Sequence, residues 1–155
     1  MLDGVNRRFE EVEHTADIAI RVWGRDLAEL FANAAYGLAC QVVDPDEVGR
    51  TGFGEASPGS AEPLSRAIER SVELEAYDAE TLLVAWLGEL LYLGERDGCV
   101  FTDFDILEVR PTRLRAVVRG GPVRERQRHI KAVTFSDLEI VHTGEGYETT
   151  IVFDV

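Results

Sequence analysis

The length, composition and charge of the chain are those of a globular protein and exclude several other classes. Its 155 residues suit a single domain, which we expect to span residues 1-155, and 45% hydrophobic with 29% charged residues exclude a disordered segment. The formal net charge of -13 excludes the broad basic surface that tight, direct RNA binding requires, and it suits a basic protein partner.

The N-terminal part of the chain predicts two strands followed by a helix. Phe9–His14 is short and strand-like, and Ile18–Trp23 alternates between apolar and other residues, so the first turn lies between these two segments. The apolar period then becomes helical, with Asp26 as the N-cap and Asp44-Pro45 as the end of the helix.

Residues 44–63 are rich in glycine, serine and proline and contain few apolar anchors. We expect an exposed connection here. Gly52-Phe53-Gly54 has Ser57 at the third glycine position of a nucleotide-binding loop, and neither a preceding strand nor a following helix start is evident. A loop without a nucleotide site is the favoured interpretation.

The middle of the chain predicts a half-exposed strand and a nearly enclosed helix. Ser71–Ala76 alternates between apolar and charged residues. Ala79–Leu93 carries apolar residues around most of its circumference, with Asp78 as the N-cap and a break over Gly94–Gly98. The helix is too short, and too interrupted by glutamates, to span a membrane.

Four further strands are predicted toward the C-terminus. They are Val100–Val109, Leu114–Arg119 before a Gly-Gly-Pro run, and a hairpin of Asp137–Val141 and Tyr147–Phe153 around the turn residues Thr143–Gly146. Strands interspersed with isolated helices predict an α+β fold, a two-layer sandwich in which a mostly antiparallel sheet packs with two main helices.

The sequence indicates neither a membrane span nor a zinc site. No stretch reaches the roughly eighteen uninterrupted apolar residues of a span, so we expect a cytoplasmic protein. Cys40 and Cys99 lack the paired spacing of zinc ligands, and we expect two buried, reduced thiols.

Three charged residues stand in unusual settings. Lys131 is the only lysine beside fifteen arginines, Asp17 begins a strand, and Asp154 ends an apolar strand beside Val155 and its α-carboxylate. If these strand ends meet, like charges a few Å apart repel by roughly 4 kcal/mol per pair at an effective dielectric near 20. A calcium or magnesium ion, or the Lys131 ammonium, would offset this repulsion. The alternative is a frayed C-terminus with a solvated Asp154.

Four distinctive motifs follow one another along the chain. Phe9–Ile18 contains the run E-H-T-A-D, and Ala79–Tyr92 contains a central L-L-x-x-W-L-x-E-L-L segment; both resemble motifs of the archease family, which usually has Asn at the open position of the second. Ile130–Phe135 resembles its K-A-V/I-T-Y motif, and Ile151–Val155 its terminal V-x-x-D-I/V. The chain departs from the family pattern at Gly88 (usually Asn), Phe135 (usually Tyr) and Ser136 (frequently His).

The resemblance implies an activator rather than a stand-alone enzyme. Archeases assist the RtcB-type RNA ligase of tRNA splicing and RNA repair, promoting GTP-dependent guanylylation of the ligase histidine and repeated turnover. The family's metal ligands correspond to Asp17, Asp154 and Val155, and its essential lysine corresponds to Lys131. The expected cofactor is a divalent metal ion, with calcium as the favoured ion. RNA would be contacted only through the ligase. A chaperone-like modulator of other RNA-modifying enzymes and a small metal-dependent hydrolase are the alternatives.

Overall fold

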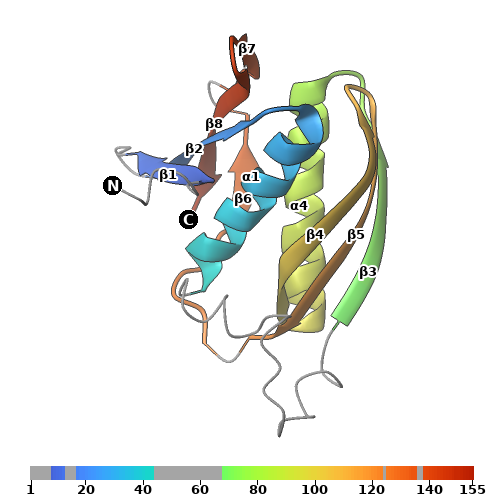
Figure 1. The fold of residues 1–155 in the computed structure, drawn as a ribbon. Coiled ribbons are helices and arrows are strands. Elements are labelled where there is room, and N and C mark those ends of the chain that lie inside the picture. The colour runs from blue at the N-terminus through green and yellow to red at the C-terminus, as the bar shows by residue number, and fades with distance from the viewer. Residues whose placement is uncertain (1–7, 13–16, 44–67, 124, 136–137) are drawn as a thin grey trace, which may run out of the picture.

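The structure is a computed structural model that describes residues 8–12, 17–43, 68–123, 125–135 and 138–155. These residues form two α-helices and eight strands (Figure 1). In chain order the elements are β1 (Phe9–Val12), β2 (Ile18–Gly24), α1 (Leu27–Val42), β3 (Ile68–Glu75), α4 (Ala79–Asp97), β4 (Cys99–Arg110), β5 (Arg113–Pro122), β6 (Ala132–Thr134), β7 (Val141–Thr143) and β8 (Gly146–Asp154).

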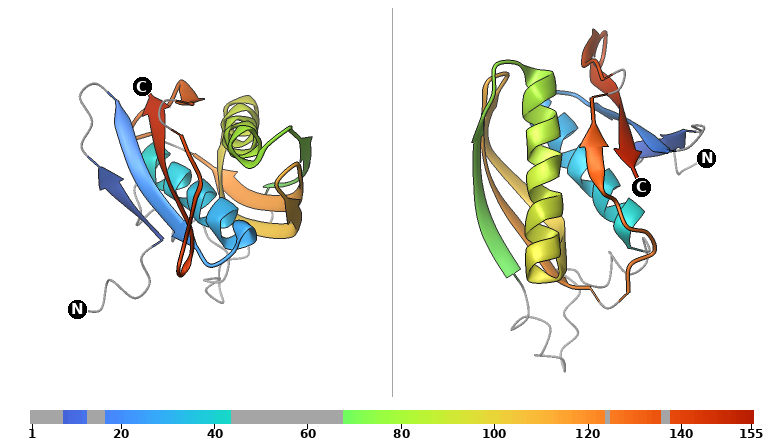
Figure 2. Two further views of the ribbon diagram at one scale, coloured as in Figure 1. Left: turned by 90° about the horizontal axis from the view of Figure 1, so that it is seen from above. Right: turned by 180° about the vertical axis from the view of Figure 1, so that it is seen from behind.

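The strands form two sheets, with the two helices between them (Figures 1 and 2). Sheet A has the order β1-β2-β8-β6, with β7 also paired to β8, and sheet B has the order β3-β5-β4. Every strand pair in the described residues is antiparallel. Helix α1 packs on β2 and β4, and α4 packs on β4 and β6. The predicted α+β class, with two main helices on antiparallel strands, is confirmed.

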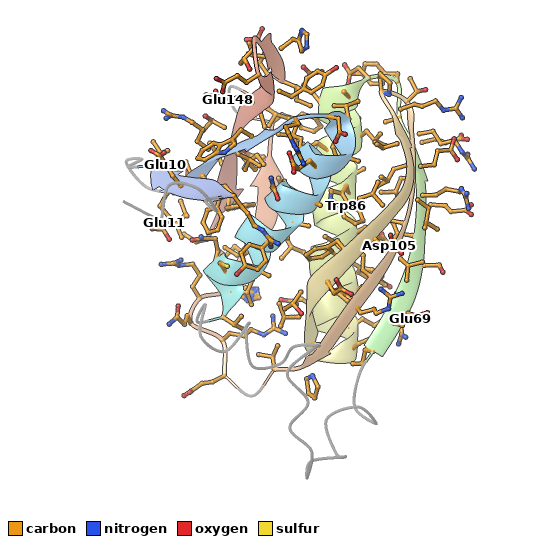
Figure 3. All side chains as sticks on the ribbon, in the orientation of Figure 1. Glu10, Glu11, Glu69, Trp86, Asp105 and Glu148 are labelled. Carbon is orange, nitrogen blue, oxygen red and sulfur yellow. The ribbon has the colours of Figure 1, made fainter. Side chains whose placement is uncertain are left out.

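Trp86 lies at the centre of the core and joins the two helices to sheet B (Figure 3). Its side chain is 0% exposed. The indole Nε1 donates a hydrogen bond of 2.9 Å to the carbonyl oxygen of Phe31 in α1, and the ring packs edge-to-face on Phe104 of β4 at 6.2 Å between centroids. Burying a large aromatic side chain with its one polar atom satisfied stabilises the fold substantially.

Both predicted N-caps are confirmed. The Asp26 carboxylate accepts a hydrogen bond of 2.8 Å from the Glu29 amide at the start of α1. The Asp78 carboxylate accepts one of 2.8 Å from the Thr81 amide at the start of α4, and hydrogen bonds from Thr81 lower the pKa of Asp78. Each carboxylate thus satisfies an amide without a partner inside its helix.

The predicted break after Leu93 is wrong, because α4 continues to Asp97. Gly94 is buried inside the helix, where a β-carbon would come within 2.8 Å of the Cys99 carbonyl oxygen. Glycine therefore permits close packing at this position. The helix ends instead at Gly98, which has the left-handed conformation (φ 64°) typical of a helix C-terminus.

The end predicted for the strand at Arg119 is also wrong, because β5 runs on to Pro122. Gly120 pairs with Ile68 on one side and Phe101 on the other. A β-carbon at Gly120 would overlap the Val100 carbonyl oxygen. The glycine is required where β4 and β5 approach each other closely.

The position predicted for the first strand of the hairpin, Asp137–Val141, is wrong, because β7 spans Val141–Thr143 and shares only Val141 with it; Asp137 lies outside the described residues. Strand β7 begins at Val141, and residues 138–140 make their hydrogen bonds elsewhere. The Ile140 amide donates to the Glu80 carboxylate of α4 at 3.0 Å, and the Thr149 hydroxyl donates to the Glu139 carbonyl at 2.8 Å. These long-range partners could not be read from a local pattern.

Several sequence predictions concern residues outside the described ranges. They are the end of the first strand at His14 and the turn between His14 and Asp17, the end of the first helix at Asp44-Pro45, and the connection over residues 44–63. Cys40 and Cys99 are both buried and free, as predicted. In the part of the chain that the structure describes, neither helix is long and apolar enough to cross a membrane.

Candidate functional site

The C-terminal end of β8 brings three distant parts of the chain together. Strand β8 lies between β2 and β6, with Ile18 paired to Phe153 and Ala132 paired to Asp154. The Lys131 amide also donates a hydrogen bond of 2.7 Å to the Asp154 carbonyl oxygen. Figure 2 shows this end of β8 beside the start of β6. The residues just before β2 and β6 therefore flank the same strand end.

Asp17 and Asp154 share one face of sheet A. Continuing the β2–β8 register by one residue places Asp17 opposite Asp154, and residues opposite each other in an antiparallel pair have β-carbons about 5 Å apart. Phe153 is 0% exposed and points to the helices, so the side chains on either side of it in β8 point the other way. Asp154 is exposed and Asp17 half-buried. The register, continued by one residue, thus predicts that the two carboxylates lie near each other, on the face of sheet A turned away from the helices.

The main chain of Lys131 lies next to this pair, whereas its side chain points toward α4. Strand alternation puts it on the same side as Val133, opposite the face that carries Asp154. The Lys131 side chain is exposed and forms no ion pair with any residue in the described ranges. It borders a groove between α4 and residues 129–133. The main chain at Lys131 therefore separates the carboxylate pair from this groove, and the side chain lies on the groove side.

The donor set at the strand end fits a hard divalent cation. Two carboxylates and the main-chain oxygens around Val155, which is 41% exposed, are the oxygen ligands that calcium and magnesium prefer. Over the described ranges, no cluster of three or more His, Cys, Asp or Glu side chains is positioned to hold a metal ion. The described side chains would therefore supply only part of a coordination shell, and the rest would come from main-chain oxygens, water or a partner.

The groove itself was not predicted from the sequence. Its walls come from α4 and from a segment about 40 residues later in the chain, and no local pattern links the two. One contact across it joins Glu95 of α4 to the His129 ring at 3.4 Å. The sequence drew attention to two residues of this part of the molecule, the single lysine and Gly88, but not to their proximity.

The fold and this strand end define a small α+β protein whose candidate site is a carboxylate pair beside a lysine. The model of the Archease protein family (MTH1598/TM1083) matches residues 9–155. The chain belongs to the archease family.

Curated relatives and solved structures agree with this assignment. The "Protein archease" of Methanosarcina mazei is 34% identical over 157 residues, which cover 96% of this chain and 97% of that protein. The "Protein archease" of Saccharolobus solfataricus is 34% identical over 155 residues, covering 96% and 99%. The solution structure of Methanobacterium thermoautotrophicum protein 1598 superposes with a TM-score of 0.65 at 26% identity, covering 95% of this chain and 98% of that one.

A second solved structure shares the fold. The crystal structure of an archease from Thermotoga maritima, described as a possible chaperone, superposes with a TM-score of 0.58 at 20% identity. The matched region covers 93% of this chain and 94% of that one.

Proposed function

We propose that this protein activates an RtcB-type RNA ligase in tRNA splicing or RNA repair, by promoting guanylylation of the ligase histidine and repeated turnover. The observation that carries the proposal is the pairing of β8 with both β2 and β6. In this pairing the main chains next to Asp17, Asp154 and Lys131 meet at one strand end, which supports the assignment of these three residues. Membership in the archease family supports the choice of partner.

Each of the three residues would have its own role in positioning a phosphate group. Asp17 and Asp154 present acceptor oxygens on one face of sheet A, and Lys131, whose main chain adjoins Asp154, presents a compact ammonium with three donors on the opposite face of the same strand end. A bound divalent cation would add positive charge that orients phosphate oxygens. The ligase histidine supplies the nucleophile for guanylate transfer, so an activator needs to contribute only positioning and charge stabilisation, which these groups can supply.

The test is multiple-turnover RNA ligation by a purified RtcB-type ligase with GTP, with and without this protein. We expect Asp17→Asn, Asp154→Asn and Lys131→Ala each to reduce the stimulation at least tenfold, and to reduce transfer of labelled guanylate to the ligase. Glu148→Gln is the matched control. It removes a carboxylate from the same strand, six residues and about 20 Å from Asp154.

Normal stimulation by all three site variants would contradict the proposal. A calcium titration gives a second test, because loss of either aspartate should raise the calcium concentration needed for half-maximal stimulation. Thermal unfolding of each variant checks that the fold is intact, since all three side chains are at least partly exposed.

A chaperone-like role for other RNA-modifying enzymes is the second candidate. It is favoured by the description of the Thermotoga maritima archease as a possible chaperone. A chaperone acts through surface binding, so it would keep its effect after loss of the carboxylate pair. The same three variants therefore separate the two functions.

A further inference from the structure

A groove of about 410 Å³ lies between α4 and the segment that leads into β6. Its walls are formed on one side by Val84, Gly88, Leu91, Tyr92 and Glu95 and on the other by residues 129–133. This volume is within the range of sites that bind small ligands or large side chains. Lys131 belongs to its lining, so the groove adjoins the carboxylate pair at the end of β8.

Gly88 is the feature of this groove that packing within the chain does not explain. Glycine inside a helix is unfavourable, and the other two glycines inside described helices have a steric reason to be there. A β-carbon at Gly37 would come within 2.7 Å of the Ile20 side chain, and one at Gly94 within 2.8 Å of the Cys99 carbonyl oxygen. A β-carbon at Gly88 would meet no atom of the described residues within 4 Å, apart from its chain neighbours and the backbone of its own helix. The space over Gly88 is open, and a ligand that approaches the helix backbone would account for it.

The charges around the groove indicate what would enter it. The Glu95 carboxylate lies 4.0 Å from the Arg126 guanidinium, which offsets its charge, and 3.4 Å from the His129 ring, which adds an ion pair only when it is protonated. Lys131 has no ion-pair partner in the described ranges. The unmatched charge at the groove is therefore positive. Tyr92 is 58% exposed at the rim, and such amphipathic aromatic side chains are common in protein interfaces.

The floor of the groove is apolar. Val84, Leu91 and Val133 are only partly buried, so apolar surface remains in contact with water. Covering such a surface with an apolar side chain is favourable. The complementary ligand thus has an apolar group beside an acidic one.

We propose that this groove receives a segment of the partner ligase, with an apolar side chain over Gly88 and an adjacent carboxylate on Lys131. The inference deepens the proposed function and rests on it. The groove and the Asp17–Asp154 pair lie on opposite faces of sheet A, and the main chain at Lys131 joins them at the end of β8, so a partner that wraps around this strand end would contact both. A peptide segment with an apolar side chain next to an acidic one matches the apolar floor of the groove and the Lys131 ammonium, which has no ion-pair partner in the described ranges.

The test fills the groove without disturbing the core. Gly88→Leu places a side chain in open space, so the fold should persist and the melting temperature should rise. We expect this variant to bind the purified ligase at least tenfold more weakly than wild type by calorimetry without nucleotide. Glu89→Leu is the matched control, since it adds the same side chain to the next position of α4, outside the groove lining. It should bind as wild type does.

A second pair of variants tests the charge. Lys131→Glu should weaken ligase binding more than Lys131→Gln, because it places a negative charge against the carboxylate of the partner. Equal binding by the two variants would overturn the assignment of that carboxylate.

The outcomes separate the groove from the proposed function. Wild-type binding by Gly88→Leu overturns the groove proposal, whereas normal ligase stimulation by the Asp17, Asp154 and Lys131 variants overturns the proposed function. GTP alone is titrated against the wild-type and Gly88→Leu proteins. Binding of GTP that depends on Gly88 would make the groove a nucleotide site and overturn the peptide assignment.

Discussion

Alanine substitutions at Gly120 and Gly88 are expected to change stability in opposite directions. Gly120 lies where β4 and β5 pass closely, and a β-carbon there would lie 2.7 Å from the α-carbon of Phe101 and overlap the Val100 carbonyl oxygen. Gly88 lies inside α4, and a β-carbon there would meet no atom of the described residues within 4 Å, apart from its chain neighbours and the backbone of its own helix. The added methyl group is identical, and only the surroundings differ.

The magnitudes follow from the two environments. Ordinary carbon–carbon contacts lie near 3.5–4.0 Å, so Gly120→Ala requires β4 to move by about 1 Å, and its neighbours are backbone atoms rather than flexible side chains. Overpacking of this kind costs about 3 kcal/mol. Gly88→Ala should stabilise by about 1 kcal/mol, because alanine is the better helix former. For a chain of this length we expect melting temperatures about 6–12 °C lower for Gly120→Ala and about 2–4 °C higher for Gly88→Ala.

Thermal unfolding followed by circular dichroism, together with denaturant unfolding, measures both changes. A double variant should show the sum of the two effects, because the sites lie on different elements and the β4 backbone atoms that crowd Gly120 do not adjoin Gly88. A shift of the melting temperature in the same direction for both substitutions would contradict either the steric overlap at Gly120 or the open space at Gly88.

Three further predictions concern the core, a helix cap and a thiol. Trp86→Phe should destabilise by about 2 kcal/mol in denaturant unfolding, because it removes the hydrogen bond to Phe31 and leaves a cavity. Asp26→Ala should cost about 1 kcal/mol by the same measurement, whereas Asp26→Ser should cost less, because serine also caps helices. Burial raises the pKa of the Cys99 thiol to about 11, so the unfolded chain loses this proton at lower pH than the folded protein. Stability should therefore fall as the pH rises from 9 to 11, and Cys99→Ala should lessen that fall.

Local sequence patterns predicted the helices and most strands because their signals are local. The apolar period around Trp86 and the caps Asp26 and Asp78 act within a few residues, and each is found as predicted. The boundaries at Gly94 and Gly120 could not be predicted in this way. At both positions a distant backbone carbonyl, rather than a local preference for a turn, explains the glycine.

In the candidate site, too, the local features could be predicted and the long-range packing could not. The unusual settings of Asp17, Asp154 and Lys131 were visible in the sequence, and the β-sheet register brings their main chains together. The groove depends on the packing of α4 against the segment before β6, which the sequence did not indicate. In the sequence, Gly88 is only a departure from the family pattern. Its open surroundings depend on the packing of α4 in the structure.

The central place of β8 also bears on when the site can form. Strands β2 and β6 do not pair with each other, and each reaches the common end only through β8, which follows both in the chain. A growing polypeptide that has made every earlier element still lacks the strand that aligns Asp17 with Lys131. Nascent or partly folded chains would therefore lack the complete arrangement, which is available only to molecules whose last strand has docked.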